Sequence, residues 1–218
     1  MANYFVLKHL NNLANGIALH QYFSVRNKDG SITITLTVAV KLINLSSTKS
    51  TLDLNGLATK IEENGKQILK GSTTWNRVLP NGKSKLEQIN VSVMLSINPV
   101  NSLKEISKGD YAIAIIDHFA GDQTKFKEQG KADMNGMYAA VIGSAKVGVY
   151  VHEIGHLINL DDNYSTKTNN PGTGLMGMAN GQLTFITRSD VFDLATPYIT
   201  GRLNTSGLYP PKVKLTII

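Results

Sequence analysis

The chain contains no cysteine in its 218 residues. This absence excludes disulfides, thiolate metal ligands and a cysteine nucleophile, so a metal site here must use His, Asp and Glu side chains. The sequence also has no apolar run long enough to span a bilayer, and its first residues lack the regions of a secretory signal. We therefore expect a soluble protein without a membrane span. Its location stays open among the cytosol, a mature form whose leader has been removed, and secretion or injection by a leaderless route.

Acidic residues are scarce relative to basic ones, with 16 Asp and Glu against 22 Lys and Arg, which gives a formal charge of +6. A basic balance favours nucleic acid or an anionic surface as a partner. The lysines, however, are dispersed along the chain instead of forming one stripe interleaved with aromatic side chains. We therefore expect a solvated basic surface and no nucleic-acid partner.

Hydrophobic residues make up 42% of the chain, which is ordinary for a globular protein. No repeat, low-complexity tract or linker rich in Pro, Gly or Ser divides the sequence. The length fits one domain, so we predict a single domain over residues 1–218. The role of residues 1–20 and the oligomeric state stay open.

Period-two and helical patterns of apolar residues alternate along the chain and predict an α+β fold. Asp29-Gly30 and Asn81-Gly82 supply the turns of two expected hairpins. We expect Ser50 or Thr51 to cap the first helix, and Ser189-Asp190 to start a short helix near the C-terminus. The expected strands cover residues 22–26, 31–45, 73–78, 85–97, 111–117 and 136–142, and the expected helices cover residues 52–69, 145–160 and 191–194.

The segment AKVGVYVHEIGHLINL, residues 145–160, carries the most informative pattern. His152 and His156 lie one helical turn apart beside an apolar stripe that would pack on the sheet. Side chains at this spacing have Cβ atoms about 5–6 Å apart, from which two imidazoles can converge on one metal ion. Glu153 is rotated about the helix axis from both histidines, so it can take a proton from a metal-bound water instead of ligating the metal.

A catalytic zinc site normally takes three protein ligands, and Asp162 is the predicted third ligand. Asp161 is the alternative, because a different exit from the helix would exchange the two neighbouring carboxylates. The pattern His152-Glu153-x-x-His156-x-x-Asn159-x-x-Asp162 resembles the long zinc signature of the metzincin metallopeptidases, His-Glu-x-x-His-x-x-Gly-x-x-His/Asp. Asn159 stands where the family has Gly. Asn is the residue other than Gly that best tolerates positive φ, so we expect the sharp turn to be kept.

The resemblance implies a twisted mixed sheet with a backing helix and an active-site helix, plus a smaller irregular C-terminal lobe. The upper lobe would span about residues 20–160 and the lower lobe about residues 161–218. The resemblance also implies a Met-turn beneath the metal, for which Met176 is the first choice and Met178 the second. A tyrosine is frequent two positions after that Met in the family, but this chain has Met178 there. Tyr164 is the candidate substitute.

Metzincin-like architecture further implies an edge strand along which an extended peptide pairs by main-chain hydrogen bonds. We place this edge strand at residues 136–141, although an ordinary edge strand without a ligand has the same appearance in sequence. The expected substrate-binding residues are Gly136, Met137, Tyr138, Ala139 and Ala140.

Together these features predict a zinc-dependent endopeptidase with Zn²⁺ as cofactor, Glu153 as general base, and a peptide or protein substrate. One alternative is an effector, toxin or binding domain that keeps the metalloprotease fold and acts by recognising a partner protein. Another is a basic interaction module in which the motif is accidental. The sequence discloses neither the cleavage-site preference nor the means by which activity would be kept latent.

Overall fold

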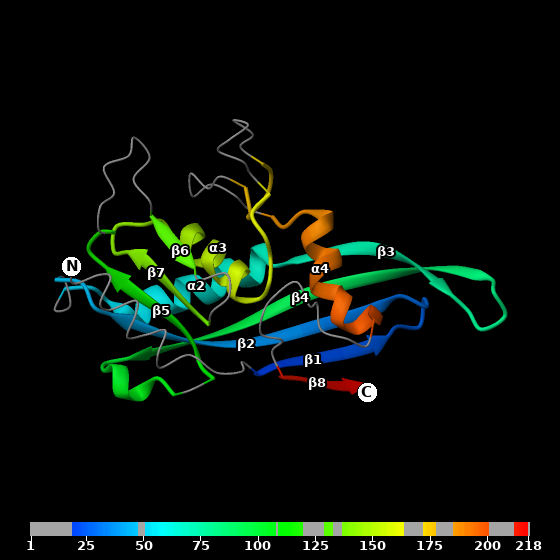
Figure 1. Cartoon of the computed structure of the whole chain (residues 1–218), viewed down its shortest axis with the longest axis horizontal. Coiled ribbons are helices and arrows are strands. Elements are labelled where there is room, and N and C mark those ends of the chain that lie inside the picture. The colour runs from blue at the N-terminus through cyan, green and yellow to red at the C-terminus, as the bar shows by residue number, and fades with distance from the viewer. Residues whose placement is uncertain are drawn as a thin grey trace.

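The computed structural model describes residues 19–47, 51–107, 109–119, 129–132, 137–163, 172–177, 185–200 and 212–217. This part of the chain forms an α+β fold in which helices pack on a curled, mixed β-sheet (Figure 1). The strands are β1 (Leu19–Arg26), β2 (Ile32–Asn44), β3 (Lys70–Val78), β4 (Ser84–Val100), β5 (Tyr111–Ile116), β6 (Gly130–Ala132), β7 (Tyr138–Ile142) and β8 (Lys212–Ile217). The helices are α2 (Leu54–Ile68), α3 (Val147–Leu157) and α4 (Arg188–Thr200), with a 3₁₀ turn η1 at Leu103–Glu105.

Six of the strands lie side by side in the order β3-β4-β2-β5-β7-β6. Strand β2 is parallel to β4 along one edge, and its other edge pairs first with β1 and then with β5. Strands β5 and β7 continue the parallel part of the sheet, whereas β3 and β6 run antiparallel at its two ends. Strand β8 pairs in parallel with β1, so the last described segment of the chain joins the first.

The alternation in β2 places its even-numbered apolar side chains in the core, as predicted. These residues are Ile32, Ile34, Leu36, Val38, Val40 and Leu42, each at most 1% exposed. Both predicted hairpins are confirmed, because β1 pairs antiparallel with β2 and β3 with β4. Gly30 and Gly82 take positive φ values of 85° and 76° in their turns, a backbone region that glycine enters without strain.

Helix α2 packs along the face of the sheet that holds the core. Gly65 makes this close approach possible, since a Cβ at this position would overlap the side chain of Leu95 in β4. The helix begins after Asp53, whose carboxylate accepts a 2.9 Å hydrogen bond from the Gly56 amide. The predicted cap at Ser50 or Thr51 is therefore wrong, because the helix starts later than its apolar pattern suggested.

Helix α4 packs on the same face, where a Cβ at Gly71 of β3 would lie 2.5 Å from Val191. It begins at Arg188, before the predicted start at Ser189-Asp190, and extends to Thr200, well beyond the short helix expected over residues 191–194. Thr187 caps the helix by accepting from the Asp190 amide, and Asp190 accepts in turn from the Thr187 amide at 2.6 Å. None of the helices in the described residues is long and apolar enough to cross a membrane.

Candidate metal centre

Helix α3 supplies two imidazoles that face each other. His152 and His156 lie one turn apart, and their ring centroids are 4.8 Å apart with the ring planes nearly perpendicular. The two Nε2 atoms approach to 3.2 Å. Both side chains are less than a tenth exposed. Two hydrophobic-core neighbours on the same helix, Val151 and Ile154, are fully buried and hold it against the rest of the fold.

Two backbone carbonyls determine which nitrogen of each histidine ring carries the hydrogen. The other nitrogen keeps its lone pair. Nδ1 of His152 lies 2.7 Å from the Leu175 carbonyl oxygen, and Nδ1 of His156 lies 2.9 Å from that of Leu160. A carbonyl oxygen only accepts, so each Nδ1 must carry the hydrogen and donate it. In the neutral tautomers both Nε2 atoms therefore present lone pairs to the space between the rings, as metal-ligating histidines do.

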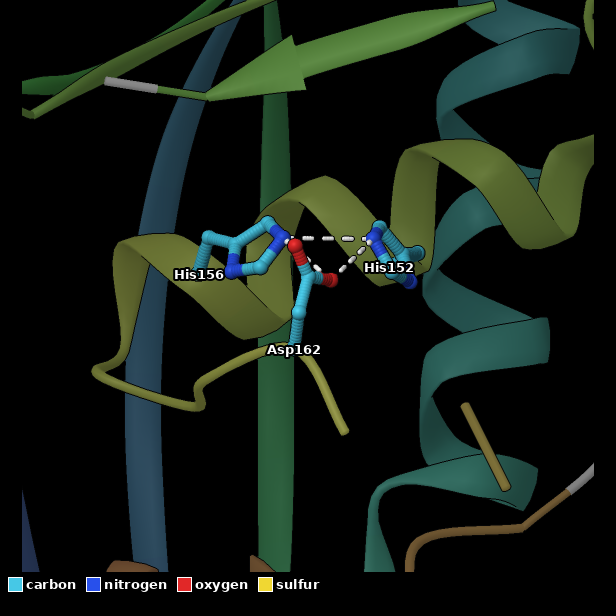
Figure 2. A group of neighbouring side chains, drawn as sticks. All are labelled: His152, His156 and Asp162. Atoms are coloured by element: carbon cyan, nitrogen blue, oxygen red, sulfur yellow. Dashed lines mark hydrogen bonds and ion pairs between the residues drawn. The ribbon is translucent and has the colours of Figure 1, made fainter. Parts of the chain in front are cut away.

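A sharp turn after the helix brings Asp162 to the same space. Asn159 has φ 69°, the only positive φ outside glycine in the described residues, which confirms the expected turn. The Leu160 amide then donates back to the Gly155 carbonyl at 2.9 Å, closing the end of the helix. Oδ1 of Asp162 lies 3.4 Å from Nε2 of His152 and 3.3 Å from Nε2 of His156 (Figure 2). Asp161, the alternative ligand, is exposed and lies outside this group.

The three donor atoms fit one metal ion. Their separations of 3.2, 3.3 and 3.4 Å form a nearly equilateral triangle. Ligands arranged tetrahedrally at about 2.0–2.1 Å from an ion lie about 3.3 Å from one another. Oδ1 of Asp162 is buried without a hydrogen bond, which is costly for a carboxylate oxygen unless a cation is nearby. The residues present therefore match a site that could hold a metal ion.

The charges of this group reinforce one another. Burial opposes ionisation of Asp162, but the two histidines outweigh it and hold the pKa of that carboxyl well below its usual value. Burial likewise opposes the charged form of His156, yet Asp162 outweighs this effect and raises the pKa of His156. The carboxylate is therefore ionised at neutral pH and attracts any cation that enters, whether proton or metal.

Glu153 follows His152 on α3 and is 4% exposed. Its carboxylate lies against Gly130 of β6, where a Cβ would overlap its Oε1 atom and approach Cδ and Cγ at 2.9 Å. Glu153 is not one of the three grouped ligands.

The segment that carries Met176 lies directly against helix α3. Met176 is fully buried, and a Cβ at Gly155 would lie 2.7 Å from its sulfur. A turn is closed by the Gly177 amide, which donates to the Gly174 carbonyl at 3.1 Å. The Leu175 carbonyl of this turn is the one that orients His152. Met178 and Tyr164, the other residues considered for this region, lie outside the described residues.

The strand predicted over residues 136–141 is present as β7, but it does not lie at the edge of the sheet. Strand β7 pairs with β5 on one side and with β6 on the other, so Ala139, Ala140 and Val141 lie inside the sheet. Met137 and Tyr138 are buried, and Gly136 lies outside the described residues. Among the described strands, β6 occupies the edge. Its three residues are too few to show the alternation by which a strand is detected in sequence.

Three parts of the site were missed by sequence reasoning: the carbonyls of Leu160 and Leu175, the contact of Gly155 with Met176, and the contact of Gly130 with Glu153. The only available signal was Gly155, because a glycine inside a helix often marks a close approach. Backbone carbonyls carry no residue-type signature, so the sequence offered no sign of the Leu160 and Leu175 contacts. Gly130 lies far from Glu153 in the sequence, so their contact could not be read from spacing either.

No protein-family model matches the chain, and no curated protein matches its sequence significantly.

Proposed function

We propose that this chain is a zinc-dependent endopeptidase with a metzincin-like catalytic domain. The observation that carries the proposal is the convergence of two histidine lone pairs and one carboxylate oxygen within 3.4 Å of one another. Two imidazoles and one carboxylate, with a coordination position left over, form the donor set of catalytic zinc sites. The buried carboxylate of Glu153, one residue after the first ligand, adds a candidate proton acceptor.

His152, His156 and Asp162 would hold the ion in this proposal. When bound, zinc lowers the pKa of its water and polarises the scissile carbonyl. Glu153 would accept a proton from the attacking water and return it to the leaving amine. In the neutral imidazoles, the carbonyls of Leu160 and Leu175 hold the hydrogen on Nδ1 and leave the Nε2 lone pairs for the ion. No serine or cysteine nucleophile is required.

Two further arrangements support the proposal. Met176 packs beneath the metal-binding helix in a tight turn, as the Met-turn of the resemblance would require. Strand β6 lies at the sheet edge beside Glu153 and so replaces β7 as the strand along which an extended peptide would pair. Residues 1–218 would then form a single catalytic domain whose C-terminal part closes the site from below.

Metal analysis of the purified protein tests the proposal before any substrate is known. We expect about one zinc ion per wild-type chain, the usual stoichiometry of a mononuclear site, and loss of that zinc in His156→Ala. Glu153→Gln should keep the zinc and lose cleavage of an unfolded protein substrate, since the amide cannot accept the proton. Chelator should abolish wild-type cleavage.

A wild type that stays metal-free when zinc is supplied would contradict the proposal. A fully active Glu153→Gln variant would show that Glu153 is not the base.

A further inference from the structure

Gly130 is the place where the edge strand β6 touches the candidate general base. A Cβ at this position would overlap Oε1 of Glu153 and lie 2.9 Å from both Cδ and Cγ. Carbon atoms that are not bonded to each other attract at about 3.5–4.0 Å, so these separations are strongly repulsive. The Glu153 side chain thus occupies the volume that any residue other than glycine would need.

Both backbones are held in place at this contact. Strand β6 is held to β7 by the pairs Gly130↔Val141, Lys131↔Ala140 and Ala132↔Ala139. The amide of Ile142 also donates to the Gln129 carbonyl at 2.9 Å, which fixes the start of β6. On the other side, Glu153 extends from a buried turn of α3. The part that can move is the end of the Glu153 side chain.

We propose that Gly130 is a positioning residue for Glu153, because its missing side chain leaves the volume that the carboxylate occupies against β6. The inference rests on the proposed function, in which Glu153 is the base. It also makes the strand along which a peptide would pair the same strand that supports the base. A displacement of about 1 Å at a catalytic group can reduce the rate on the order of 10²-fold.

The first test observes the carboxylate itself. With ¹³C-labelled glutamate side chains, the Glu153 carboxyl resonance is identified by its disappearance in Glu153→Gln. We expect Gly130→Ala to shift this resonance while the protein stays folded. Gly143→Ala is the matched control, because a Cβ there would lie 3.5 Å from Ile115, an ordinary contact.

The second test measures kinetics at full zinc loading. Gly130→Ala should bind zinc like the wild type and lower kcat on the order of 10²-fold, with a smaller change in KM and a shifted acid limb of the pH profile. In a Glu153→Gln background the same change should have little further effect on kcat, since no base remains to be displaced. Gly65→Ala is the control for strain elsewhere, because its Cβ would overlap Leu95. It should lower stability without moving the pH profile.

The outcomes separate the inference from the proposed function. An unshifted Glu153 resonance in Gly130→Ala overturns the inference, and so does a shifted resonance with unchanged kcat and pH profile. An equal fold-loss of kcat when Gly130→Ala is introduced into the wild type and into Glu153→Gln also overturns it. A wild type that binds no zinc and cleaves nothing instead removes the proposed function, while the resonance comparison still decides whether Gly130 sets the position of the carboxylate.

Discussion

Two main-chain carbonyls determine what the histidines of α3 can do. Leu160 and Leu175 each accept from an Nδ1 atom, so in the neutral rings both Nε2 atoms point their lone pairs toward Asp162. Three acceptors within 3.4 Å of one another repel unless a proton or a metal ion lies between them. The chemistry of the site therefore depends on two carbonyl oxygens, and the one at Leu160 is placed by the turn that follows α3.

Asn159 is the residue on which that turn depends, because its φ of 69° lies where side chains with a Cβ are strained. Replacing it with alanine should lower the free energy of unfolding by about 1 kcal/mol, the penalty for a left-handed residue without a compensating side chain. Asn159→Ala should also weaken zinc binding, since the turn carries Asp162. Urea unfolding and zinc titration measure both effects. Asn159→Gly is the matched control and should stay close to the wild type, because glycine enters this region freely.

Zinc affinity should depend on pH through His156. Its pKa is raised by Asp162 in the metal-free protein, and its proton must leave before Nε2 can bind a metal. Affinity is therefore expected to be full at high pH and to fall as pH drops through a midpoint above the usual histidine value of 6.5. Zinc titrations across this range measure the midpoint. In Asp162→Asn zinc binding should weaken because a ligand is lost, and the midpoint of the binding that remains should move to lower pH, because the carboxylate that favours the imidazolium is gone. An unchanged midpoint would contradict this account.

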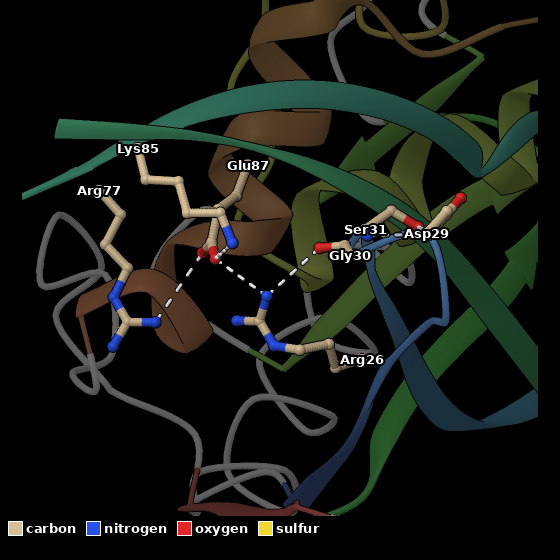
Figure 3. A network of polar contacts seen from close by, with 7 residues as sticks. All are labelled: Arg26, Asp29, Gly30, Ser31, Arg77, Lys85 and Glu87. Carbon is tan, nitrogen blue, oxygen red and sulfur yellow. Dashed lines mark hydrogen bonds and ion pairs between the residues drawn. The ribbon is translucent and has the colours of Figure 1, made fainter. Parts of the chain in front are cut away.

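At the scale of the elements, one buried carboxylate links the strands β1, β3 and β4. This cluster is separate from the candidate metal centre. Glu87 of β4 accepts a 2.9 Å hydrogen bond from Arg26 at the end of β1, and Lys85 and Arg77 lie 3.6 and 4.0 Å away (Figure 3). The Glu87 side chain is 2% exposed, whereas the three cations are about half exposed. Burial opposes the charge of Glu87, but the three cations outweigh it and lower the pKa of this carboxyl.

Replacing this carboxylate tests its contribution to stability. Glu87→Gln should lower the free energy of unfolding by about 2 kcal/mol at neutral pH, the usual value for a hydrogen bond to a charged group. Because the folded-state pKa is depressed, the contribution is present above the unfolded value and is lost as pH falls through the folded pKa. The difference between wild type and variant should therefore shrink below pH 4.5, the ordinary value for the group. Chemical unfolding at several pH values measures it.

The exposed carboxylate of Glu63 on α2 provides the control. Glu63→Gln should change the free energy of unfolding by less than about 0.5 kcal/mol, as is usual for surface substitutions. A loss at Glu87 that persisted unchanged at low pH would indicate packing instead of charge as its cause.

At the scale of the molecule, the candidate metal centre joins segments that are separated along the chain. The candidate ligands come from α3 and the turn after it, the carbonyl that orients His152 comes from residues 172–177, and the strand beside Glu153 comes from residues 129–132. An ion bound at this centre would hold all of these segments in their native arrangement. Binding to the folded state alone adds to its stability.

We therefore expect zinc to raise the thermal stability of the whole domain. At a free concentration 1,000 times the Kd, binding should add about 4 kcal/mol to the free energy of unfolding. For a chain of this length that corresponds to a Tm increase on the order of 10 °C. Differential scanning calorimetry with and without zinc measures the shift. His156→Ala should show none, and a shift of equal size in that variant would place the ion elsewhere.

Local periodicity was sufficient for much of this protein. The alternating core of β2, the two hairpins and the helix bearing His152 and His156 follow from residue spacing, because burial on one face of a strand or helix imposes that spacing. The turn at Asn159 was also predictable, since few residue types tolerate positive φ. The sequence by itself thus determined the presence of two convergent imidazoles followed by a carboxylate.

Only the tertiary structure decided what surrounds those ligands. Strand β6 is three residues long and was identified by its pairing with β7, which moved the sheet edge from the place that sequence had indicated. The carbonyls of Leu160 and Leu175 belong to the main chain that every residue possesses, and the contact between Gly130 and Glu153 joins segments far apart in the sequence. Side-chain identity encodes spacing along one element, whereas the approach of one backbone to another is set by how all the elements pack together.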